Sequence, residues 1–134
     1  MGQKHYVEAE RTFRECLAAA AKVGPEDYSW EGFFIESMVG DSLAKQGKHG
    51  EADPVLIAGY RGMKTHEERI LPHERQWLVL VVESIFNHYA TWGKPEEAAK
   101  WEKELAIERA KLPKVEVNSP PIKEALTNDR AANR

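Results

Sequence analysis

A short pattern that recurs along the chain is the feature that most limits how this chain can fold. Three stretches align without gaps, at residues 4–10, 47–53 and 93–99, and each contains the pair Glu-Ala. The three alanines are Ala9, Ala52 and Ala98. A repeat of this length is one supersecondary unit that cannot bury its apolar face alone, so that neighbouring copies stack. The sequence therefore predicts an array of similar units in a row.

The pattern of apolar residues indicates that each unit consists of helices. Apolar residues recur at steps of three and four, and glycine or proline separates one such segment from the next. The chain is also rich in alanine, glutamate, lysine, arginine and leucine, which favour helix. We therefore predict an all-α chain of five helices, over residues 5–23, 27–46, 49–69, 73–92 and 95–111.

Small residues occupy repeated places around the predicted turns. A glycine before the second helix of a unit, Gly47 or Gly93, permits a tight turn. Ala52 early in that helix lets it approach the first helix closely, and Gly40 is expected to be a second point of close approach. The single cysteine, Cys16, falls on the predicted inward stripe, where we expect a small core residue.

Composition limits the classes of function. The chain has 134 residues, the size of one domain, and a formal net charge of −3. This charge argues against a non-specific nucleic-acid binder, which needs a basic surface. No apolar run approaches the roughly 18 residues of a membrane span, and no signal peptide opens the chain. A lone cysteine is typical of a reducing compartment, so a cytoplasmic location is expected.

The repeated residues resemble those of the tetratricopeptide repeat family. The resemblance rests on Gly40, on Gly47-Lys48-His49-x-Glu51-Ala52 and on Gly93-Lys94-x-x-Glu97-Ala98, and it covers residues 3–106. The long spacing is similar to the repeats of kinesin light chains and to arrays at the C-terminal end of large bacterial serine/threonine protein kinases. No kinase motif is present in the sequence.

The resemblance implies antiparallel helical hairpins stacked as a right-handed superhelix. It divides residues 1–112 into a half repeat at 5–23 and full repeats at 27–69 and 73–111, followed by a flexible tail at 113–134. Because the first helix lacks its partner, we expect the chain to be a fragment of a larger, kinase-like protein. The implied function is protein–protein interaction, without catalysis or a cofactor.

In this family the first helix of each unit lines a concave groove that binds peptides. The resemblance implies a groove lined by Phe34, Ser37, Met38, Asp41, Lys45, Leu80, Glu83, Asn87 and Thr91. Asp41 and Glu83 make this surface mildly acidic, so a basic or neutral peptide segment is expected as the partner. Only Lys45 and Asn87 match the lysine and asparagine with which some family members hold a peptide carboxylate.

Other functions remain open from the sequence. One alternative is a homodimer, formed by Tyr6, Phe13 and Leu17 on the first helix or by the tail folding back. Another is a sensor of a small molecule or signal peptide that uses the tryptophans, although their helical spacing favours a role in packing between units. Neither His66 nor His73 begins a zinc motif of the type His-Glu-x-x-His, so we expect no metal site.

Overall fold

The computed structural model of the chain describes residues 2–20 and 29–113, and in these residues it contains helices and no strands. The all-α prediction is therefore confirmed. The elements are α1 (Gly2–Ala20), α2 (Trp30–Lys45), α3 (His49–Thr65), the short 3₁₀ helices η3 (Glu67–Arg69) and η4 (Pro72–Glu74), α4 (Arg75–Trp92) and α5 (Pro95–Ala110). No helix in this part of the chain is long and apolar enough to cross a membrane.

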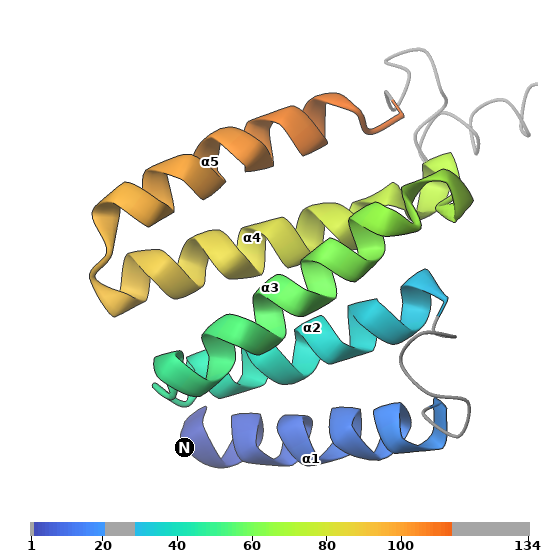
Figure 1. Cartoon of the computed structure of the whole chain (residues 1–134). Helices are drawn as coiled ribbons and strands as arrows, with labels where there is room; N and C mark the ends of the chain where they lie inside the picture. Colours follow the sequence, from blue (N-terminus) through green and yellow to red (C-terminus); the bar gives the residue numbers. More distant parts are fainter. Residues whose placement is uncertain (1, 21–28, 114–134) are drawn as a thin grey trace, which may run out of the picture.

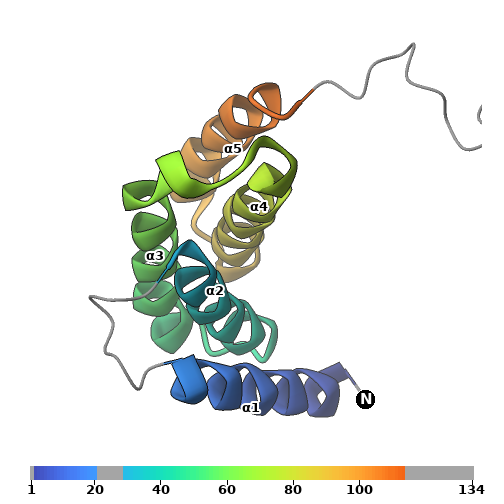
Figure 2. The ribbon, with the colours of Figure 1, turned by 90° about the vertical axis from the view of Figure 1, so that its right-hand side faces the viewer.

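The helices follow one another along the molecule in chain order, as Figures 1 and 2 show. Helices α2 and α3 form one antiparallel pair and α4 and α5 form the next, while α1 packs against α2 at one end. Helix α4 contacts both α2 and α3, so the second pair rests on the first. In the view of Figure 2, α3 and α4 lie on opposite sides of α2.

Helix boundaries differ from the predicted ones near the connection between the two pairs. Helix α3 ends at Thr65 instead of residue 69, and α4 begins at Arg75 instead of residue 73. Both differences arise because the intervening residues form the tighter 3₁₀ turns, the second of which begins at Pro72. The predicted ends at residues 21–23 and 27–28 and the tail at 114–134 lie outside the described residues.

The turns inside the two pairs are built in the same way, as the repeat predicts. Gly47 and Gly93 both adopt left-handed backbone, with φ of 82° and 80°. The amide of the following lysine then donates to a carbonyl five residues earlier, from Lys48 to Leu43 and from Lys94 to Tyr89, each across 3.0 Å. This is the Schellman arrangement that ends a helix at glycine. The role predicted for the two glycines is confirmed.

Glycines also set how closely the helices of the first pair approach. A methyl group on Gly40 would lie 2.8 Å from Leu56 Cγ and 2.9 Å from its backbone nitrogen, so the predicted close approach is confirmed. Gly59 on α3 makes an even closer approach to Phe33 and Ser37 on α2. Helix α3 therefore rests directly on the backbone of α2 at these points.

Cys16 is exposed rather than inward, so its predicted place in the core is wrong. The equivalent residues of the later units, Gly59 and Leu105, are buried because each lies on a helix packed against its partner in the pair. Helix α1 has no preceding partner among the described residues and packs mainly against α2. The side of α1 that carries Cys16 is consequently open to solvent.

Candidate functional site

The candidate site is the face that α2 and α4 share, where the structure places most of the predicted groove residues. On α4, Trp77, Leu80, Ser84, Asn87 and Thr91 follow one another at steps of three and four residues, so they lie on one side of the helix. We call this surface the α2–α4 face. Its two ends differ in chemistry.

One end of the α2–α4 face is aromatic. The ring of Phe34 on α2 meets that of Trp77 on α4 edge to face, with the centroids 5.5 Å apart. Leu80, one turn after Trp77 on α4, is partly buried against the core. Trp77 keeps 41% of its surface exposed, although the sequence predicted that all four tryptophans fill space between units. The aromatic end, consisting of these three residues, therefore offers an exposed indole on a packed support.

The other end is a cavity of about 410 Å³, which we call the polar pocket. Four predicted groove residues, Asp41, Lys45, Asn87 and Thr91, line it. The remaining lining residues are Tyr6, Ala44, Gly47, His49, Ser84 and His88. Tyr6 comes from α1, so three helices and the first turn of α3 together enclose the pocket.

Three predicted groove residues belong to neither end of the α2–α4 face. Ser37 is completely buried, because α3 comes so close to α2 at Gly59 that it covers this residue, and Met38 is 7% exposed within the core. These two residues have almost no surface for a ligand, which corrects the expectation for them. Glu83 lies toward α5, where it pairs with Arg109 at 2.8 Å and lines a smaller cavity of about 320 Å³.

The acidic groups of the face are balanced by basic neighbours. Asp41 pairs with Lys45 one turn later on α2, at 2.9 Å, and Glu83 pairs with Arg109. Lys45 also lies 5.6 Å from the centre of the Tyr6 ring. The face therefore carries no local excess of negative charge, unlike the mildly acidic surface expected from the sequence.

A histidine cluster beside the polar pocket was not identified from the sequence. The Nδ1 atoms of His49 and His88 are 3.0 Å apart, and His88 Nε2 lies 3.1 Å from Asp53 Oδ1. Trp92 stacks on the His49 ring at 5.6 Å between centroids. The available signal was that His49 directly follows one glycine turn and His88 precedes the other by one helical turn, so stacking of the repeats brings them together.

A second polar cluster joins the far ends of α3, α4 and α5. Glu108 is fully buried and accepts hydrogen bonds from Lys64 Nζ at 3.0 Å and from Arg75 Nη2 at 3.1 Å. Glu67 pairs with the same two cations. Burial alone would raise the pKa of Glu108, but Lys64, Lys111 and Arg75 outweigh it and hold this pKa below its usual value. Each of these charged groups has a partner of opposite charge, although Arg75 Nε is buried without a hydrogen bond, and the pairing indicates a structural role.

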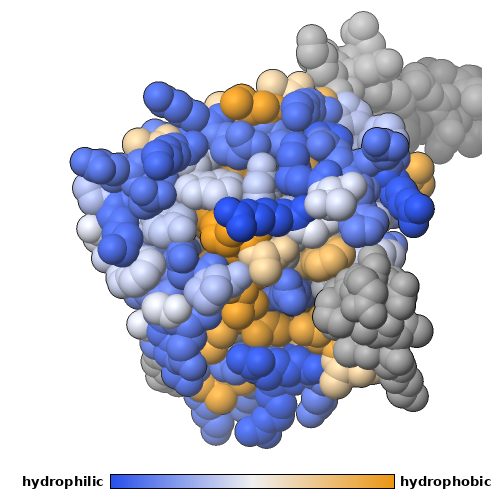
Figure 3. Space-filling model, viewed as in Figure 1, coloured by the Kyte–Doolittle hydropathy of each residue, from blue (hydrophilic) through white to orange (hydrophobic). Residues whose placement is uncertain are grey.

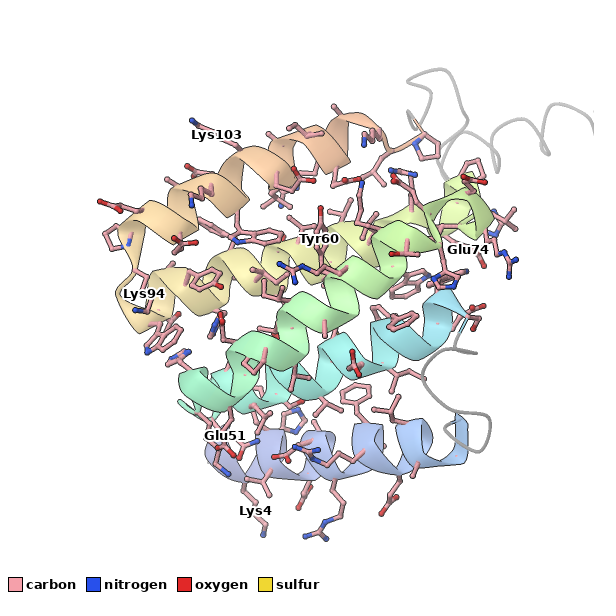
Figure 4. The ribbon with its side chains drawn as sticks, in the orientation of Figure 1. Lys4, Glu51, Tyr60, Glu74, Lys94 and Lys103 are labelled. Atoms are coloured by element: carbon pink, nitrogen blue, oxygen red, sulfur yellow. The ribbon has the colours of Figure 1, made fainter. Side chains whose placement is uncertain are left out.

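A further cavity of about 640 Å³ lies between α3 and α5. Tyr60 points from α3 toward α5 (Figure 4), where its hydroxyl donates to Glu104 across 2.9 Å and its ring meets Trp101 edge to face. In the part of the chain that the structure describes, no three His, Cys, Asp or Glu side chains form a group able to hold a metal ion.

Comparison of the chain with protein-family models, with curated proteins and with solved structures finds no match in any of the three.

Proposed function

We propose that the chain is a protein–protein interaction module of the tetratricopeptide type, which binds an extended peptide along the α2–α4 face. The proposal includes the superhelical stacking of the hairpins that the sequence resemblance implies. The observation that carries it is the exposure of Trp77 on the same side of α4 as the polar pocket. Exposed aromatic side chains on a rigid support are the commonest anchors in protein interfaces.

The distance between the two ends determines the length of peptide that fits. Trp77 and Asn87 are ten residues apart on α4, which corresponds to about 15 Å at the rise of an α-helix. An extended chain advances about 3.3 Å per residue, so roughly five peptide residues span the two ends. One ligand can therefore contact the indole and the pocket together.

The chemistry of the face selects the kind of peptide. The aromatic end suits an apolar side chain, and the polar pocket offers the hydroxyl of Tyr6, the amide of Asn87 and the hydroxyl of Thr91. Because Asp41 is paired with Lys45, a strongly charged ligand would have to compete with an existing ion pair. We infer a neutral segment with one large apolar residue and polar residues about four positions away.

The experiment is a selection of displayed random peptides on the full chain, followed by calorimetry on the synthesised peptides. We expect Trp77→Ala to weaken binding by about thirtyfold, which corresponds to a loss of about 2 kcal/mol. Ile107→Ala is the matched control, because Ile107 is 50% exposed on α5 and lines none of the cavities described. Its affinity should stay within twofold of the wild type.

Circular dichroism should show the same helicity for both variants, since neither side chain is buried. Peptides that bind Trp77→Ala and the wild type equally well would place the binding surface elsewhere. A selection that enriches no peptide at all would count against a peptide-binding function.

A further inference from the structure

The histidine cluster fixes the first turn of α3 to the last turns of α4. His49 opens α3, His88 lies near the end of α4, and Asp53 is one turn further along α3. The side chain of His88 has no exposed surface, so its ring nitrogens cannot exchange these partners for water. The hydrogen bonds of His88 therefore hold the two helical pairs together at the wall of the polar pocket.

The partners determine where the protons lie. At neutral pH the Asp53 carboxylate can only accept, so His88 Nε2 carries a proton and donates it across 3.1 Å. A neutral His88 then has a lone pair on Nδ1, and His49 Nδ1 must supply the proton that joins the two nitrogens 3.0 Å apart. A single proton between the two Nδ1 atoms forms a hydrogen bond, so the contact between the rings is attractive.

The same geometry cannot hold two protons between the rings. A first added proton is tolerated, because either ring can be charged while the other keeps its lone pair. When both rings are charged, two N–H groups meet head to head and two positive charges lie in contact. A separation of 3.0 Å then becomes repulsive, and the tether between α3 and α4 opens.

The surroundings of the cluster also disfavour the protonated form of His88. Burial lowers the pKa of His88, and the charge of His49 lowers it further, against the opposing effect of Asp53. Burial and Asp53 raise the pKa of Tyr89, which keeps this phenol neutral. The other charged or titratable groups around the cluster are Glu97 on α5, Lys94 above the Trp92 ring, and Tyr6, Asp41 and Lys45 across the pocket.

We propose that His49 and His88 form a proton-sensitive tether that keeps the polar pocket assembled at neutral pH and releases it when both rings carry an added proton. Its consequence for a peptide rests on the proposed function, whereas the tether itself does not. The partner would be held at neutral pH and released in mildly acidic conditions.

The first test measures proton uptake on unfolding, using urea denaturation between pH 7.5 and 5. The unfolded chain takes up a proton that the folded pair resists. The free energy of unfolding should therefore fall as the pH drops below about 6.5, the ordinary pKa of histidine in an unfolded chain. The folded-to-unfolded ratio of the wild type should fall by up to about tenfold per pH unit. His49→Asn should lose most of this slope, since its amide keeps a donor near the Nδ1 position and can turn its oxygen toward a protonated His88.

His73→Asn is the matched control, because it removes an exposed histidine from η4 and should keep the wild-type slope. Long-range proton–nitrogen NMR at pH 7.5 should find His88 protonated on Nε2 and His49 on Nδ1. A wild-type slope in His49→Asn, or a proton on Nδ1 of His88, would overturn the tether.

The second test concerns the ligand and separates the two proposals. A peptide selected on the wild type at pH 7.5 should bind the wild type about tenfold more weakly at pH 5.5, by the same linkage to one proton. The same peptide should bind His49→Asn with equal affinity at the two pH values. Equal affinity of the wild type at both values would refute control of the pocket by the tether. If no peptide is selected while the unfolding and NMR results hold, the proposed function fails and the tether stands.

Discussion

Gly59 lies where α3 rests on the backbone of α2, and this contact shows how one residue sets the helix spacing. A methyl group there would lie 2.0 Å from Ser37 Oγ and 2.8 Å from the Phe33 carbonyl oxygen. The carbonyl belongs to a helix and cannot shift freely. We expect Gly59→Ala to destabilise the chain by about 1–3 kcal/mol despite the better helix propensity of alanine, as measured by urea denaturation.

Gly50→Ala provides the control for this prediction. Gly50 is also on α3, but no atom lies within 4 Å of the methyl group that it would gain. The substitution should therefore be neutral or stabilise by up to about 1 kcal/mol. If both alanine variants are equally stable, the two helices are not in contact at Gly59.

At the scale of residues, the sequence predicts the positions at which the local backbone conformation requires a particular residue. It does not predict properties that depend on contacts with other helices. Gly47 and Gly93 were predictable because a left-handed turn after a helix selects glycine in both helical pairs. Cys16 was not, since its burial depends on a neighbouring helix, and no described helix covers this side of α1. The meeting of His49 with His88 depends on how two turns 46 residues apart are stacked, which no local pattern specifies.

At the scale of elements, the buried Glu108 joins three helices through a few charges. Lys64 of α3 and Arg75 of α4 both donate to it, and its side chain has no exposed surface. Removal of the Glu108 charge takes away the buried one of the two carboxylates that Lys64 and Arg75 share, the other being Glu67. We expect Glu108→Gln to destabilise the chain by about 3–5 kcal/mol, as measured by thermal or urea unfolding.

Lys111→Gln is the matched control for the same cluster. Lys111 also lies near Glu108, at 3.7 Å, but it is 44% exposed. A solvent-exposed pair contributes at most about 1 kcal/mol, so this variant should remain close to the wild type. A similarly small loss in Glu108→Gln would mean that the buried pairs only compensate their own desolvation.

The α2–α4 face also shows, at the scale of elements, what the sequence can predict and what it cannot. Helical spacing predicted that Asp41 and Lys45 share one side of α2 and that Asn87 and Thr91 share one side of α4, whereas the sequence resemblance implied that both sides line one groove. The structure gathers all four around the polar pocket. Helical spacing predicts on which side of a helix a residue lies, but not whether a neighbouring helix buries it. Ser37 shares that direction and is buried, because the glycines of α3 draw this helix over it.

At the scale of the molecule, the two outer helices shield the apolar interior of the row. Figure 4 shows Lys4 and Lys103 pointing away from the row at opposite ends, on α1 and α5. In Figure 3, hydrophobic residues gather in a band between α3 and α1, and the outer edge beyond it is mostly hydrophilic. Phe13 is partly buried and packs against the core. Helix α1 therefore covers one side of α2 at the edge of the row.

This covering role leads to a prediction that also tests the homodimer alternative. Phe13→Asp places a charge where α1 meets the core, so we expect α1 to detach and the exposed apolar surface to cause association that increases with concentration. Val7→Asp alters a residue of α1 that is 42% exposed, and should leave the molar mass unchanged. Light scattering after gel filtration, over a wide concentration range, measures both effects. If the wild type is instead a dimer that Val7→Asp converts to a monomer, the open side of α1 is an interface between two copies of the chain.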